Sequence, residues 1–295
     1  MGYYSRLKTG FVLSIASVRV LWLHPKLALY PLGSAITAAV FMGALLGPLF
    51  LAAGTSFGAV ELAVLFVVYL GTTYITALFN AGLVYSVREV FHGNDPHVGD
   101  GLRAAAGNSG TLLIWAFVSA VIGIVIQSLE SRGEIASQLV AMVFSFGWTI
   151  ATFFVIPVIV FQDDVTARSM FTDSASTFKE TWGETVGTTL GLGIVPALIV
   201  LPGGALAIGL LVLSENLAMV VIAITIALAA IVLSMLVGGV ITGVAKTALY
   251  VYATEDIQPD EFDRFDFDSM FETDGGDSAK ISTGPGGLKN SNRGI

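Results

Sequence analysis

Four residues of the types that bind metals lie close together in the run HGNDPHVGD: His92, Asp95, His97 and Asp100. Imidazole and carboxylate groups are common zinc ligands. The same run contains glycine and proline, and aspartates in such turns commonly hydrogen-bond the local backbone instead. We therefore interpret the run as a polar loop and predict no metal site. If the loop does bind a metal, His92 and His97 are the candidate ligands.

Three polar residues, Thr72, Thr76 and Asn80, recur every four positions within an otherwise apolar run. This spacing places them on one face of a helix. A polar stripe inside a membrane can line a path for a solute. It can also make hydrogen bonds between helices, which average about 0.6 kcal/mol each. We favour the second interpretation and keep the three residues as binding-site candidates under the first.

Other chemistry has little support in the sequence. The 295 residues include no cysteine, which excludes disulfides, cysteine metal sites and a cysteine nucleophile. No phosphate-binding loop, GxSxG, HExxH or dinucleotide-binding glycine pattern occurs. Clustered Lys and Arg, which nucleic-acid binding requires, are also missing. We expect a protein that is not an enzyme, needs no cofactor and binds no nucleic acid.

The distribution of apolar residues predicts the fold class. Charged residues make up 12% of the chain, about half of the usual share in soluble domains. A helix needs roughly 20 apolar residues to cross a bilayer. We predict an all-α integral membrane protein with a membrane domain at residues 1–258 and six spans, at about 27–53, 60–85, 111–127, 137–161, 186–213 and 217–240.

A short pattern is repeated in the chain. Residues 14–22 read SIASVRVLW, and residues 174–182 read SASTFKETW, each followed by an apolar run. A weaker copy lies around residues 102–103. We predict three helix-plus-hairpin repeats, each with a short amphipathic helix before two spans. In the first copy Ile15, Val18 and Trp22 share one face and the serines lie off it, as expected for a helix in the headgroup plane.

The distribution of basic residues predicts the orientation. With six spans, Arg132 is the only one of the 14 Lys and Arg residues on its side of the membrane. Loops rich in Lys and Arg stay in the cytoplasm. We predict a protein of the cell membrane with both termini and the short helices in the cytoplasm, so that the three repeats are parallel.

Two apolar runs depart from simple spans. Pro196 and Pro202 predict that the fifth span is kinked or broken. The sixth run, residues 217–254, contains Lys246 as its single charge and exceeds the length of one span. We predict that this helix leaves the membrane near Gly239 and continues past the surface, with Lys246 at the interface.

The C-terminal tail, residues 259–295, is acidic and aromatic before it becomes polar. Ten of the 22 acidic residues lie between positions 255 and 277, interleaved with four phenylalanines that begin at Phe262. Solvated tails contain few aromatic residues. We predict that residues 255–271 dock on the basic connections that carry Arg88, Arg103, Arg168 and Lys179, or on a partner with a similar basic patch. The alternative is a disordered, solubilising tail, which we expect in any case beyond residue 275.

Four runs in a fixed order resemble an uncharacterised family of haloarchaeal multi-span membrane proteins: SVRVLWLHPKLALYPLGSA, FHGNDPHVGDGLRAA, ARSMFTDSASTFKETWGE and ALYVYATEDIQPDEFD. The resemblance covers about residues 10–270. The family has no established activity, so the resemblance implies no site residues. It does imply a high-salt cytoplasm, which suits a net charge of −8.

These observations favour a non-enzymatic membrane module that binds the lipid bilayer and a protein partner at its cytoplasmic face. A small-solute transporter is the alternative, because broken helices often form substrate sites. A membrane enzyme acting on lipids is a third possibility, supported by the short amphipathic helices alone.

Overall fold

The computed structural model describes residues 3–52, 58–131, 133, 135–180, 193–213, 216–255 and 262. Helices, and no strands, occur among these residues. In chain order the helices are α1 (Tyr3–Leu23), η1 (Pro25–Ala28), α2 (Leu29–Ala52), α3 (Ala59–Phe91), α4 (Val98–Gly107), α5 (Ser109–Glu130), α6 (Ile135–Thr152), α7 (Val155–Phe161), α8 (Ser169–Glu180), α10 (Ile194–Leu213) and α11 (Leu217–Glu255).

Six helical segments are long and apolar enough to cross a membrane, which confirms the predicted number. They are Pro25–Leu49, Ala59–Phe91, Ser109–Glu130, Ile135–Phe161, Ile194–Leu213 and Leu217–Glu255. The predicted beginning of the fifth span and Trp182 lie outside the described residues. So does the tail, apart from Phe262.

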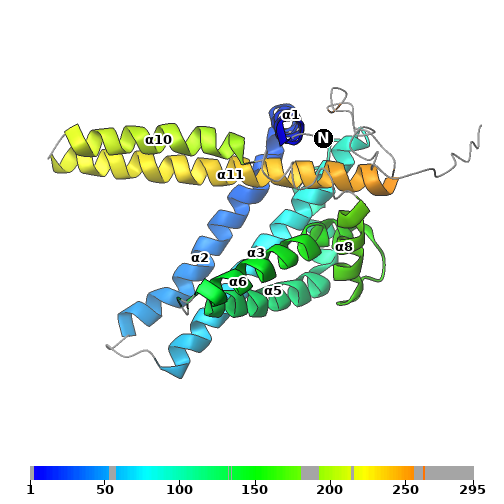
Figure 1. Cartoon of the computed structure of the whole chain (residues 1–295), viewed down its shortest axis with the longest axis horizontal. Helices are drawn as coiled ribbons and strands as arrows, with labels where there is room; N and C mark the ends of the chain where they lie inside the picture. The colour runs from blue at the N-terminus through cyan, green and yellow to red at the C-terminus, as the bar shows by residue number, and fades with distance from the viewer. Residues whose placement is uncertain are drawn as a thin grey trace, which may run out of the picture.

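The spans form three hairpins, α2–α3, α5–α6 and α10–α11, which point in different directions (Figure 1). The α5–α6 hairpin lies along α3, whereas α10 and α11 run side by side and extend away from α2 beyond the place where α11 crosses its first turns. Helix α1 is seen nearly end-on in Figure 1, so its axis runs across that of α11. The hairpins therefore meet at one end of the molecule, from which the α10–α11 hairpin extends away from the other two.

The buried core lies at the end where the hairpins converge. It takes residues from α1, the last part of α3, α7, α8 and the second half of α11. Its largest fully buried side chains include Tyr30, Phe154 and Phe262. Away from this end the helices expose large apolar side chains, such as Val143 on α6 and Met235 on α11. Such surfaces need lipid or another protein to cover them.

The fourth span is interrupted at Phe153 and Phe154, between α6 and α7. Pro157 explains the position, because a proline ring collides with the carbonyl group four residues earlier, here that of Phe153. The interruption frees the Phe154 N–H, which donates to Ser174 Oγ at 3.0 Å. A serine of the repeated pattern thus satisfies a buried backbone group, as buried N–H groups require.

The last hairpin corrects one prediction and extends another. Helix α10 continues through Pro202, so the fifth span is not broken there. Helix α11 continues past Gly239, as predicted, and its residues between Val240 and Val251 form the centre of the core. Lys246 accordingly does not lie at an open surface: its Nζ packs over the Phe153 ring, 4.4 Å from the ring centroid. The excess length of this run is explained by burial in protein.

Helices α3 and α4 cross at two glycines, Gly82 and Gly101. A methyl group on Gly101 would lie 2.6 Å from the Gly82 carbonyl oxygen and 2.7 Å from Ser86 Oγ. Tyr30 closes the same crossing, with its hydroxyl 2.5 Å from Ser86 Oγ and 3.3 Å from the Val98 carbonyl oxygen. This contact joins the start of the first hairpin to α4.

Candidate functional site

The polar stripe on α3 makes local hydrogen bonds. Thr72 Oγ1 donates to the Val68 carbonyl at 2.8 Å, and Thr76 Oγ1 donates to the Thr72 carbonyl at 2.9 Å. The Asn80 side chain faces α11, where its Oδ1 would lie 3.8 Å from a Cβ on Gly243. The hydroxyls of Thr72 and Thr76 thus bond their own helix, whereas the amide of Asn80 lies between α3 and α11. Solute binding at these three residues stays a prediction.

The four residues of the polar loop have separate partners. Asp95 pairs with Lys26 at 3.0 Å, and a hydrogen bond from Lys26 lowers the pKa of the exposed Asp95 carboxyl. Asp100 Oδ2 accepts the His97 N–H at 3.0 Å, which stabilises the first turn of α4 as a capping residue does. Among the described residues, no group of three His, Asp or Glu side chains is arranged to hold a metal.

The distinctive charged site lies where α3 and α11 end together. Glu255, the last residue of α11, accepts from Arg88 Nε at 2.7 Å and lies 3.1 Å from His92 Nε2. The other ring nitrogen of His92 is 2.8 Å from the Arg88 carbonyl oxygen. We call Arg88, Phe91, His92, Glu255 and Phe262 the end cluster. One carboxylate in it therefore bridges two basic side chains of a different helix.

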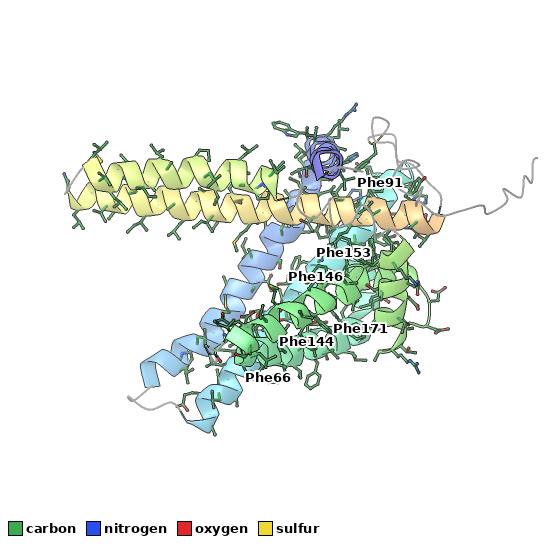
Figure 2. The ribbon with its side chains drawn as sticks, viewed as in Figure 1. Phe66, Phe91, Phe144, Phe146, Phe153 and Phe171 are labelled. Carbon is green, nitrogen blue, oxygen red and sulfur yellow. The ribbon has the colours of Figure 1, made fainter. Side chains whose placement is uncertain are left out.

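Aromatic rings surround these charges. Phe262 is 1% exposed and packs edge-on against Phe91, with ring centroids 5.8 Å apart. The guanidinium carbon of Arg88 lies 4.8 Å from the centroid of the Phe161 ring, a cation–π distance. Figure 2 shows Phe91 close to the C-terminal end of α11. The end cluster thus includes one tail residue, Phe262, that is buried in the helical core.

Sequence reasoning found part of this site. It predicted that the segment beginning at Glu255 contacts Arg88 and that tail phenylalanines pack on protein, and Glu255 and Phe262 do so. It missed the role of His92, which it considered only as a metal ligand. The available signal was the position of His92 one turn after Arg88, which places both side chains on one face of α3.

The repeated pattern buries its polar residues. Ser14, Ser17 and Ser174 are fully buried, and Thr177 is 7% exposed. Ser17 Oγ donates to the Leu13 carbonyl at 2.9 Å. The serines of α1 therefore face the protein, whereas Ile15 and Trp22 on its apolar face are exposed. Because serine can bond its own helix, it can line a close helix contact without leaving a polar atom unsatisfied.

Replacing Ser174 with alanine should lower the free energy of unfolding by about 1–3 kcal/mol, because the buried Phe154 N–H loses its acceptor. The matched control is Ser176→Ala on the same helix, where the exposed hydroxyl donates only to the Asp173 carbonyl. This change should cost less than about 0.5 kcal/mol. Thermal unfolding in detergent measures both, and equal losses would contradict the proposed role of Ser174.

The helices and the buried end define a multi-pass helical membrane protein. Residues 59–259, more than half of the chain, match the model of a family of unknown function, DUF6159. The chain belongs to this family. No curated protein and no solved structure matches the chain.

Proposed function

We propose that the protein is a non-enzymatic membrane module that binds a protein partner through the face where α4, α8 and the end cluster lie. The observation that carries this proposal is the difference between the two ends of the molecule. Charged side chains from distant segments meet at the buried end, as Arg88, His92 and Glu255 do, whereas the diverging hairpins expose apolar residues. A rigid, charged end next to apolar spans suits recognition at a membrane surface.

The proposal includes an orientation. Both termini lie on the cytoplasmic side of the cell membrane. The helices α1, α4 and α8 lie on the same side, at the interface between the membrane and the cytoplasm. The near-exclusive placement of Lys and Arg on this side, with Arg132 as the exception, supports it. Reporter fusions at Gly58, Arg132, Glu215 and Ile295 test it, and an external Ile295 would contradict it.

The proposal also includes three parallel repeats. Each hairpin follows a short helix: α1 precedes α2–α3, α4 precedes α5–α6, and α8 precedes α10–α11. The shared burial of Ser14 and Ser174, at equivalent positions of the repeated pattern, supports this arrangement. A halophilic archaeal source is proposed on the resemblance of the four sequence runs, and the acidic composition suits it.

Partner binding is tested with a photo-crosslinking amino acid at Arg103 on α4 or Ser176 on α8, which are both exposed. The matched control is Val140, which is 56% exposed on α6. We expect a discrete protein adduct in native membranes at the first two positions and lipid adducts at Val140. Protein adducts at Val140 alone, or at none of the positions, would contradict the proposal.

Transport has less support than partner binding. The hydroxyls of Thr72 and Thr76 already donate to carbonyl groups of α3. Helix α10, whose predicted break was the second argument for a transporter, is continuous across Pro202.

A further inference from the structure

Helix α1 turns its large apolar side chains outward. Leu13 and Val20 are fully buried, together with the two serines between them. On the opposite side Ile15 is 51%, Trp22 81% and Leu23 57% exposed, and Arg19 is exposed among them. We call Ile15, Arg19, Trp22 and Leu23 the outer face of α1. Together the exposed Trp22, Ile15 and Leu23 form an apolar patch, and such patches are covered by lipid or by another protein.

The charge of this region is opposite to that of the chain. Residues 1–60 contain Arg6, Lys8, Arg19 and Lys26 but no aspartate or glutamate, although the whole chain has a net charge of −8. Lys26 is paired with Asp95, whereas Arg19 points to the outside of the protein next to Trp22. A basic helix with aromatic and aliphatic residues on its outer face is typical of binding to anionic lipid surfaces.

The outer face is continuous with a membrane-crossing surface. Only the short helix η1 separates α1 from α2, whose Leu29, Ile36 and Val40 are 49%, 57% and 67% exposed. This part of α2 belongs to the candidate span Pro25–Leu49. Helix α1 runs across α11 and lies beside the beginning of α2, where this span starts (Figure 1).

We propose that the outer face of α1 binds anionic phospholipid headgroups. Arg19 pairs with the phosphodiester group, because a guanidinium matches phosphate oxygens with two parallel hydrogen bonds. Trp22 lies at the depth where its ring is in apolar surroundings and its N–H reaches water or headgroups. Ile15 and Leu23 contact the upper acyl chains. The inference rests on the membrane placement proposed above, but it requires no protein partner.

Spin labelling tests the depth of the outer face in the full-length protein. The chain has no cysteine, so single labels at Ile15→Cys and Leu23→Cys are unambiguous and leave Arg19 and Trp22 in place. The references are Val140→Cys on the exposed side of α6 and Ala167→Cys in the exposed α7–α8 connection. In lipid nanodiscs we measure the collision rates of each label with oxygen and with a nickel chelate. At positions 15 and 23 we expect both rates to lie between those of the label at position 140 and those of the label at position 167.

Two other outcomes overturn the proposal. Labels as accessible to nickel as the one at position 167 place α1 in water. Labels shielded from both oxygen and nickel place it against a protein. Either result leaves the partner proposal for α4 and α8 untouched, so the two proposals fail separately.

The headgroup is tested by titrating phosphatidylglycerol into phosphatidylcholine nanodiscs and recording the mobility of the label at position 23. We expect Arg19→Gln to raise the phosphatidylglycerol fraction at half-effect about fivefold, as one basic group near an anionic surface contributes. Arg168→Gln, an exposed arginine outside α1, should change nothing. Three results would overturn the assignment. The label could respond equally in both variants, it could respond in pure phosphatidylcholine, or inorganic phosphate could produce the same change in its mobility as phosphatidylglycerol.

Discussion

Gly101→Ala is expected to lower the free energy of unfolding by about 2–3 kcal/mol, although alanine is the better helix former. The new methyl group would meet the Gly82 carbonyl oxygen at 2.6 Å and Ser86 Oγ at 2.7 Å, as well as the Tyr30 hydroxyl. A side chain could rotate away, but the Gly82 carbonyl belongs to the backbone of α3. Helices α3 and α4 must therefore separate, which weakens the hydrogen bond that Tyr30 donates to the Val98 carbonyl of α4.

The chain provides a matched control two residues earlier. A methyl group on Gly99 meets no atom within 4 Å, so Gly99→Ala should stabilise α4 by up to about 1 kcal/mol through helix propensity. Thermal unfolding of both variants in the same detergent measures the difference. If the two midpoints move in the same direction, the close α3–α4 crossing does not exist as described.

Phe262→Ala is expected to cost about 3 kcal/mol, in the range for deleting a fully buried aromatic side chain. Phe262 is 1% exposed and contacts Phe91 edge-on. Its removal leaves a cavity beside Phe91, one turn from the Arg88–Glu255 pair along α3, so we also expect faster hydrogen exchange at the end of α11.

Phe144→Ala is the control, because Phe144 is already 41% exposed on α6. It should cost less than about 1 kcal/mol in detergent. If Phe262→Ala costs no more than this control and leaves exchange at Glu255 unchanged, Phe262 is not an anchor of the tail.

The spans were predictable because their signal is local. A run of about 20 apolar residues is sufficient to indicate a helix that crosses a bilayer, and the same argument separates six runs here. The acidic segment beginning at Glu255 was predicted to dock on the connections that carry four basic residues, and of these Arg88 pairs with Glu255. Composition and spacing contain this information without reference to the rest of the fold.

Burial at the converging end was not predictable in the same way. Hydropathy places Ser14 and Ser17 towards water, but both are buried because a serine can bond its own helix and permit close packing. Hydropathy also cannot distinguish an apolar face that meets lipid from one that meets protein. This is why the pattern of residues 217–254 did not indicate that the second half of α11 forms the core.

The position of the α6–α7 interruption needed tertiary information. Pro157 indicates that a break is close, but the acceptor for the freed Phe154 N–H comes from Ser174, on another helix. His92 is a similar case, since its partner Glu255 is distant in sequence.

The continuity of α11 has a mechanical consequence. A helix of 39 residues is about 58 Å long at 1.5 Å per residue. One end forms the turn region of a hairpin, and the other carries Glu255 of the end cluster. Its first half exposes apolar side chains such as Met235, whereas residues between Val240 and Val251 are held in the core. The exposed hairpin and the ion pairs of Glu255 are therefore joined by one continuous helical backbone, with no break at which a displacement of the hairpin could be absorbed.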